Sequence, residues 1–166
     1  GYSNDEALVL VAQMSRDNAR TPMQWNGELH GGFTTGIPWL PVNENYHQIR
    51  VDEQERRENS VLNFYKELIA LRTDAVYGET VVYGRQEPFL PDQPDFTGFY
   101  RKGRENTLLV LANIRETPRT IEVPLAIKKV LLDNCCTGHK AEETKETAAG
   151  SPVCMQDFQF LVLEVF

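Results

Sequence analysis

The sequence predicts an α+β protein in which a helical, loop-rich part at residues 1–76 precedes an antiparallel β-sandwich at residues 77–166. Three observations lead to this prediction. Apolar residues recur at helical spacing within residues 60–72. Residues 18–46 are crowded with glycine and proline, which exclude regular structure. After Gly78, short apolar runs alternate with turn residues at intervals of roughly ten residues, as in a sandwich.

The composition is that of a globular domain, with 166 residues of which 41% are hydrophobic and 25% charged. The formal net charge of -7 argues against nucleic acid or an anionic membrane as partner, because the basic residues form no patch. No apolar stretch approaches the roughly 18 residues of a membrane helix, and no secretory signal is visible. Three cysteines, Cys135, Cys136 and Cys154, suit neither a disulfide framework nor a zinc motif, so we expect a cytoplasmic setting.

A first helix is expected directly after the N-terminus. Ser3 and Glu6 have the spacing of a capping box, in which each side chain binds a free backbone amide of the other residue. The apolar residues that follow lie at helical spacing and predict about three turns. They are Ala7, Leu8, Leu10, Val11 and Met14.

Residues 18–46 are then predicted to form one long ordered loop. Loops longer than about 12–15 residues are uncommon in compact domains and are usually functional or disordered. This loop contains Trp25, Phe33, Trp39 and Tyr46, and aromatic residues are atypical of disorder. We therefore expect the loop to be pinned against something large, with Phe33 and Trp39 as packing anchors.

The remaining elements follow in order. Residues 52–55 could open a helical turn, and residues 60–72, SVLNFYKELIALR, give the clearest helical pattern of the chain. Period-two alternation and short apolar runs predict strands at residues 80–83, 97–100, 107–112, 120–123, 130–132 and 160–166. The polar stretch 139–150 is expected to be an exposed loop.

The first 76 residues hold one good helix, one short helix and a loop, and they predict no strand. Such a segment buries too little apolar surface to offset about 1–2 kcal/mol of backbone entropy per residue. It must therefore pack on the sandwich or on a partner that precedes it.

Four motifs in order carry a family resemblance: RDNARTPMQW, GGFTTGIPW, VNENY and SVLNFYKELIALR. Over residues 1–77 they resemble the C-terminal third of the oligo-1,6-glucosidase and α-glucosidase branch of the α-amylase family of glycoside hydrolases. The resemblance implies the end of a (β/α)8 barrel followed by a small antiparallel β domain. Residues 60–72 resemble the eighth barrel helix, and residues 1–58 resemble the insertion between the eighth strand and that helix.

The family resemblance also implies what this chain lacks. Retaining glycosidases use two carboxyl groups about 5 Å apart, and the resemblance places both of them, and a third carboxylate, before Gly1. It thus implies that the chain alone is inactive, with no catalytic residue of its own, and that its partner is the missing N-terminal portion of the barrel. The acids at positions 52–67 are expected to form a solvated surface. His30, His47 and His139 are too scattered for a metal site or a triad, and no cofactor is implied.

Two arginines of RDNARTPMQW are the candidate contacts for an oligosaccharide substrate. In the family, the arginine of Ala-Arg-Thr-Pro binds hydroxyls of the non-reducing-end glucose together with an upstream aspartate. The resemblance therefore makes Arg20 the candidate sugar contact in the intact enzyme, with Arg16 as a second candidate. The alternative for Arg20 is a salt bridge that holds the loop, and Asp17 is expected to form an ion pair. Trp25 is expected to pack rather than to stack on sugar.

Three other functions remain open. The β domain could bind carbohydrate without catalysis, using aromatic platforms from the set Tyr83, Phe89, Phe96, Phe99 and Tyr100. The parent enzyme could be a trehalose-6-phosphate hydrolase or a sucrose isomerase, because upstream loops set linkage and substrate. The chain could also be an interaction subunit, as in the glycosidase-like ectodomains of amino-acid transporters, which require an upstream membrane helix.

Overall fold

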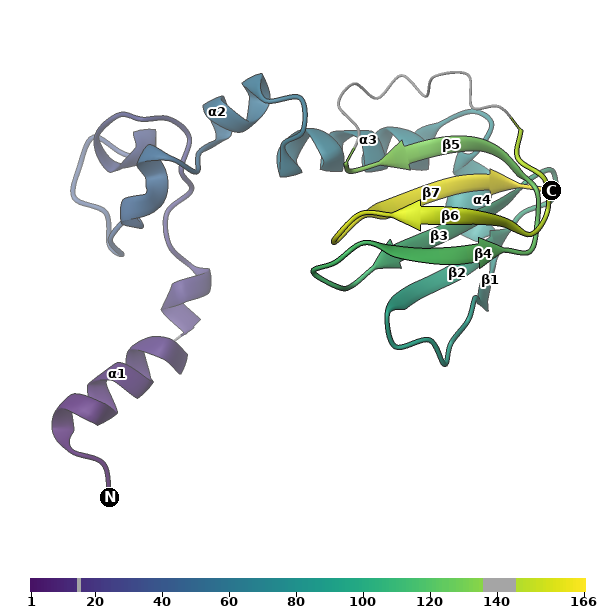
Figure 1. Cartoon of the computed structure of the whole chain (residues 1–166). Helices are drawn as coiled ribbons and strands as arrows, with labels where there is room; N and C mark the ends of the chain where they lie inside the picture. Colours follow the sequence, from purple (N-terminus) through teal and green to yellow (C-terminus); the bar gives the residue numbers. More distant parts are fainter. Residues whose placement is uncertain (15, 136–145) are drawn as a thin grey trace. The chain divides into compact units, whose positions relative to one another are not determined.

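The computed structural model describes residues 1–14, 16–135 and 146–166 of the protein (Figure 1). The chain divides into two compact units, residues 1–57 and residues 58–166. The predicted helix at residues 60–72 falls in the second unit. The domain limits of 1–76 and 77–166 stay a prediction, because they rest on the expected barrel.

The first unit consists of short helices and a long loop. Its elements are helix α1 (Asn4–Met14), the 3-10 turns η1 (Arg16–Ala19), η2 (Leu29–Gly32) and η3 (Glu44–His47), and helix α2 (Val51–Arg56). The capping box is present: the Ser3 amide donates to Glu6 Oε2 at 2.8 Å, and the Glu6 amide donates to Ser3 Oγ at 3.3 Å. The predicted start of the first helix is thus confirmed.

The first unit has no apolar core among its described residues. Apart from Pro22, every buried aliphatic, aromatic or methionine side chain that the structure describes lies between Phe89 and Val165. Within residues 18–46, the structure contains 3-10 turns and irregular backbone but no strand, as predicted for the loop. Phe33 and Trp39, expected to be packing anchors, are exposed by 49% and 84%. Within the described part of this unit, Trp39 is therefore not packed and Phe33 is only half covered.

The second unit contains all the strands described. Helix α3 (Val61–Thr73) and helix α4 (Gly78–Tyr83) precede β1 (Arg85–Pro88), β2 (Phe96–Lys102), β3 (Thr107–Asn113), β4 (Arg119–Val123), β5 (Ile127–Asp133), β6 (Ser151–Met155) and β7 (Phe160–Val165). A five-stranded antiparallel sheet has the order β1-β2-β3-β7-β5, and β4 pairs with β6 in a second sheet. The predicted antiparallel β domain is confirmed.

The five-stranded sheet carries apolar side chains on both faces, and each face is covered by other elements. Leu109 and Leu163, directly paired on β3 and β7, belong to the main core with Ile121, Val123 and Met155 of the small sheet. The next residue along each strand points the other way. Leu108 and Val162 accordingly pack with side chains of α3 and α4, which lie along the opposite face of the sheet in Figure 1.

Helix α3 confirms the clearest helical prediction of the sequence. Ser60 caps it, since the Ser60 hydroxyl accepts a hydrogen bond from the Asn63 amide at 3.1 Å. Its inner face packs on the sheet through a set of three side chains, namely Phe64, Leu68 and Leu71. Its other apolar face remains exposed, with solvent-accessible fractions of 67% for Val61, 60% for Tyr65 and 61% for Ile69.

One predicted strand is wrong, and two strands are missing from the prediction. Residues 80–83 lie in α4, because the Asp74 carboxylate accepts hydrogen bonds from the amides of Val76 and Tyr77, at 2.8 and 3.0 Å, and turns the chain just before the helix. The unpredicted strands β1 and β6 each contain a proline. Of the predicted loop 139–150, residues 139–145 lie outside the described residues, and residues 146–150 are exposed.

Candidate functional site

Arg20, the principal candidate, follows the 3-10 turn η1. Its amide donates to the carbonyl oxygen of Asp17 at 3.0 Å, and its Nη2 lies 2.5 Å from Asp17 Oδ1. The expected ion pair of Asp17 is therefore present. Both side chains are about half exposed, at 56% and 49%, so the pair is worth roughly 0–1 kcal/mol. Arg16 begins the same turn and is exposed.

The segment directly after Arg20, residues 21–25, is tied to residues 43–52. Asn43 Nδ2 donates to Thr21 Oγ1 at 3.2 Å. Gln24 Nε2 donates to Asn45 Oδ1 at 3.1 Å and to the carbonyl oxygen of Ile49. Two backbone bonds continue this ladder: the Val51 amide donates to the Gln24 carbonyl at 2.9 Å, and the Asp52 amide to the Trp25 carbonyl at 3.0 Å.

A left-handed turn closes the next part of the loop. The amides of Trp25 and Asn26 both donate to the carbonyl oxygen of Gly31, at 2.8 and 3.1 Å. His30, Gly31 and Gly32 have φ values of 56°, 64° and 70°. At Gly32, a Cβ atom would lie 2.4 Å from Asn26 Oδ1, so a side chain would collide there as well as strain the backbone. The two glycines of the GGF motif are thus explained by local geometry.

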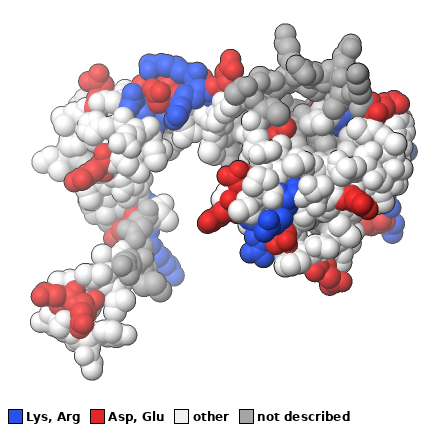
Figure 2. Space-filling model, viewed as in Figure 1, with Lys and Arg blue, Asp and Glu red and all other residues white. Residues whose placement is uncertain are grey.

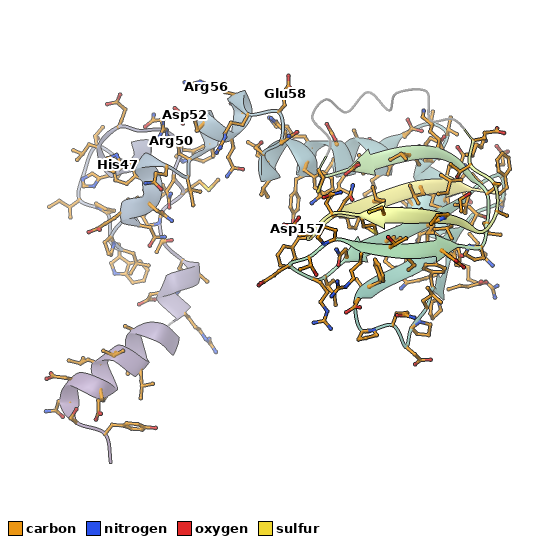
Figure 3. All side chains as sticks on the ribbon, in the orientation of Figure 1. His47, Arg50, Asp52, Arg56, Glu58 and Asp157 are labelled. Carbon is orange, nitrogen blue, oxygen red and sulfur yellow. The ribbon has the colours of Figure 1, made fainter. Side chains whose placement is uncertain are left out.

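Charged residues near α2 form an ion-pair network rather than a carboxylate pair. Arg50 Nε lies 2.8 Å from Asp52 Oδ1, and Arg50 Nη2 lies 3.6 Å from Glu53 Oε2. Arg56 reaches the same two acids at 3.7 and 3.6 Å, and Arg50 also donates to the carbonyl oxygen of His47. Figure 3 labels His47, Arg50, Asp52 and Arg56 in this segment, where Figure 2 shows blue and red atoms in contact. These acids therefore neutralise arginines.

The described residues offer no metal centre, since they contain no group of three or more histidine, cysteine or acidic side chains placed to hold an ion. His139 and Cys136 lie outside the described residues. Cys135 and Cys154 are free thiols at the surface. None of the helices that the structure describes has the length and apolarity needed to span a bilayer.

Most of the aromatic side chains suggested as sugar platforms of the β domain pack inside the domain. Phe89 and Phe96 belong to the buried core, with exposed fractions of 5% and 9%. Tyr100 packs edge to face on Phe89, with ring centroids 5.4 Å apart. Tyr83 is exposed by 80%. Two of the five predicted rings are therefore buried, Phe99 and Tyr100 are half-buried, and Tyr83 is exposed.

Sequence reasoning singled out Arg20, Arg16 and Asp17 but missed the carboxamides of Gln24 and Asn43. The available signal was the density of asparagine and glutamine in an aromatic loop that needs hydrogen-bond partners for its irregular backbone. The partners themselves lie more than twenty residues away along the chain. No periodic pattern marks such contacts.

Comparison with known proteins gives one family. A family model described as "Alpha amylase, catalytic domain" matches residues 1–84. An oligo-1,6-glucosidase of Heyndrickxia coagulans is 40% identical over 132 residues, which are 80% of this chain and 23% of that protein. A trehalose-6-phosphate hydrolase of Escherichia coli (strain K12) is 40% identical over 114 residues, covering 69% of this chain and 20% of that protein.

Two solved structures also resemble this chain. The isomaltulose synthase from Klebsiella sp. LX3 superposes with a TM-score of 0.82 at 34% identity, over 99% of this chain and 28% of that chain. A trehalulose synthase from Pseudomonas mesoacidophila MX-45 gives a TM-score of 0.82 at 32% identity, over 99% of this chain and 28% of that chain. The chain thus spans about a quarter of the length of the curated relatives it matches, from 23% to 26% for two oligo-1,6-glucosidases.

Proposed function

The chain belongs to the alpha-amylase family of glycoside hydrolases, and from this premise we propose that it is the C-terminal part of a retaining α-glucosidase acting on short α-glucosides. It contributes a sugar-binding arginine and a stabilising β domain. The observation that carries the proposal is the motif RDNARTPMQW on a loop held in place by hydrogen bonds, in a chain that is 40% identical to an oligo-1,6-glucosidase over 132 residues.

The catalytic carboxylates belong, on this proposal, to an N-terminal portion of the barrel that precedes residue 1. The pairing of three acids of residues 1–57 supports it. Asp17 pairs with Arg20, while Asp52 and Glu53 pair with Arg50. A retaining mechanism needs one carboxylate as nucleophile and one carboxyl group as acid. Carboxylates already neutralised by guanidinium groups are poor candidates for either role.

Exposed apolar surface on the helices also favours an additional barrel portion. On α1, exposed fractions reach 67% for Leu8, 56% for Val9 and 64% for Val11. On α3, the outer face carries Val61, Tyr65 and Ile69. Contiguous exposed apolar patches mark interaction surfaces. The proposed occupant of these surfaces is the N-terminal part of the barrel.

Arg20 is proposed to bind hydroxyls of the non-reducing-end glucose, with Arg16 as a weaker contact. The structure contains the salt bridge that was the alternative role for Arg20. That pair is half exposed and worth little, so a sugar hydroxyl and an incoming carboxylate can replace it at low cost. A guanidinium suits this task because its planar donors bond a carboxylate and a hydroxyl at once.

A second candidate has specific support. Relatives named trehalose-6-phosphate hydrolase and isomaltulose synthase match this chain about as well as the oligo-1,6-glucosidases do. The same fragment would then serve an enzyme of either kind, with the substrate chosen by upstream loops. A purely carbohydrate-binding β module has less support, because Phe89 and Phe96 are buried.

The test uses the full-length polypeptide of the parent reading frame and p-nitrophenyl α-glucopyranoside. We expect turnover by the wild type and a fall of about 30- to 100-fold in kcat/KM for Arg20→Ala, the effect of losing charge-assisted hydrogen bonds worth about 2–3 kcal/mol. Arg104→Ala, an exposed arginine of the β domain, is the matched control. Turnover unaffected by Arg20→Ala, or a full-length protein inert toward α-glucosides, would contradict the proposal.

A further inference from the structure

The loop that carries Arg20 lacks the usual means of holding a backbone in place. Residues 20–50, as the structure describes them, contain no strand, and Pro22 is the one buried apolar side chain among them. Hydrogen bonds between residues 21–25 and residues 43–52 tie the segment after Arg20 to a distant part of the chain. We propose that the side chain of Gln24 is the positioning residue of this loop, fixing the backbone from which Arg20 projects. This role rests on the proposed function.

The orientation of the Gln24 carboxamide follows from its surroundings. The carbonyl oxygen of Ile49 can only accept a hydrogen bond, so the group facing it must be the NH2 of Gln24. The same nitrogen donates its second hydrogen to Asn45 Oδ1, at 3.1 Å. Gln24 therefore uses both N–H bonds, and the two acceptors belong to the first and last residues of the segment 45–49.

The backbone of Gln24 adds a third contact with the same region. Its carbonyl oxygen accepts from the Val51 amide at 2.9 Å, next to the bond from Asp52 to Trp25 at 3.0 Å. One residue thus links residues 21–25 to η3, to the turn after it and to the first turn of α2. Loss of the side-chain donors leaves two acceptors, Asn45 Oδ1 and the Ile49 carbonyl, without their partner.

The carboxamide of Asn43 binds the end of residues 21–25 that is next to Arg20. Asn43 Nδ2 donates to Thr21 Oγ1 at 3.2 Å, one residue from Arg20. Pro22, between the two anchors, is buried and has a fixed φ. The anchors at Thr21 and Gln24 therefore bracket a stiff residue, so the direction of the Arg20 stem depends on both. Gln24 has the greater share because it makes more bonds.

Gln24→Glu in the full-length enzyme is the isosteric test. In this variant a carboxylate oxygen replaces the NH2 group that faces Asn45 Oδ1 and the Ile49 carbonyl oxygen. Both hydrogen bonds are lost, and the negative charge repels these two oxygens. We expect KM for p-nitrophenyl α-glucopyranoside to rise about 10-fold and kcat to fall less than 3-fold, since Arg20 serves binding more than chemistry. Gln48→Glu adds the same charge to an exposed position of the same loop and is expected to leave both constants within 2-fold.

A double-mutant cycle separates positioning from a general loss of structure. If Gln24 acts through Arg20, Gln24→Glu adds less than 2-fold to the KM of Arg20→Ala, because the contact it positions is already gone. Multiplied effects of the two substitutions would overturn the proposal. Should Gln24→Glu not fold, Asn43→Ala decides the question in its place, with a 3- to 5-fold rise in KM expected and an unchanged KM contradicting the positioning role.

Hydrogen exchange distinguishes this inference from the proposed function. In Gln24→Glu the amides of Val51 and Asp52 are expected to exchange at least 10-fold faster than in Gln48→Glu, whether or not the protein hydrolyses an α-glucoside. A wild type without turnover but with this exchange pattern would refute the proposed activity and leave the loop anchor standing. Unchanged exchange in Gln24→Glu would refute the anchor itself.

Discussion

Ser60 shows how much one side chain decides at the start of a helix. It is 8% exposed, and its hydroxyl accepts the Asn63 amide at 3.1 Å, satisfying one of the free donors of the first turn of α3. The residue lies where the chain enters the helix that covers the five-stranded sheet. Its hydrogen bond therefore supports both the helix and the packing below it.

We expect Ser60→Ala to lower the free energy of unfolding by about 1 kcal/mol, because the first turn loses its cap. Urea denaturation followed by circular dichroism at 222 nm measures the effect. Ser60→Asp keeps an acceptor at the same place and is expected to unfold within about 0.5 kcal/mol of the wild type. Equal losses for both variants would mean that the size of the residue, rather than the cap, matters.

In the candidate site, some residue contacts could be predicted from the sequence and others could not. Arg20 and Asp17 are three residues apart in one short motif, so their pairing could be expected from the local sequence. Gln24 and Asn43 find partners more than twenty residues away, across a loop whose path depends on glycines in left-handed conformation. Long-range polar contacts of this kind leave no periodic trace in the sequence.

At the scale of elements, a polar cluster joins the helices to the sheet. Glu164 of β7 is 6% exposed. Its carboxylate accepts from the Tyr77 hydroxyl at 2.7 Å and from Lys128 Nζ of β5 at 2.6 Å. Tyr77 lies between α3 and α4. Burial, followed by the hydrogen bond to Glu164, raises the pKa of Tyr77 to about 12. The cluster fixes the exit of α3 against the last strand.

The pKa of Glu164 predicts how this junction responds to acid. Burial alone raises it, but the hydrogen bonds from Lys128 and Tyr77 and the charges of Lys128 and Lys129 outweigh burial, and the pKa lies below its usual 4.5. A carboxyl group with a lowered pKa in the folded state stabilises that state above pH 4.5, and this contribution is lost as the pH falls through the folded-state pKa. Urea midpoints measured from pH 7 to pH 3 test this response.

Glu164→Gln is expected to show a shallower fall in stability below pH 4.5 than the wild type, because it has no proton to take up at this position. Its stability at pH 7 should be lower by about 1–3 kcal/mol, since Lys128 loses its charged partner. Glu122→Gln, an exposed acid of β4, is the matched control. Parallel pH curves for Glu164→Gln and the wild type would show that Glu164 does not titrate as argued.

The sequence predicts an element correctly where its hydrophobic pattern matches the way the element packs in the fold. Residues 107–112 form a nearly continuous apolar run, because β3 is covered on both faces, and this run predicted the strand. Residues 80–83, Thr-Val-Val-Tyr, have high strand propensity, yet they complete a short helix begun by Asp74, with Thr80 1% exposed. Strand β1 lies at a sheet edge and β6 in a two-stranded sheet; each is short and contains a proline, so their strand signal is weak.

At the scale of the molecule, the sequence match and the packing assign α3 differently. The catalytic-domain match covers residues 1–84 and so includes the helix, whereas its packing places it with residues 58–166. Phe64, Leu68 and Leu71 face the sheet, and Val61, Tyr65 and Ile69 face outward. A helix that is apolar on two sides is buried between two layers. The β domain supplies one layer, and the proposed barrel supplies the other.

Ile69→Gln tests the second layer by comparing two chain lengths. In the 166-residue chain, where Ile69 is 61% exposed, we expect a change in unfolding free energy within about 0.5 kcal/mol, because glutamine is a good helix former. In the full-length enzyme the same substitution should cost about 2–4 kcal/mol, since it removes apolar contact and buries an amide. Leu68→Gln, on the face that packs against the sheet, should destabilise both lengths. An equally small cost of Ile69→Gln in both chains would mean that no barrel covers this face of α3, and the assignment of the chain to the end of a barrel would fail with it.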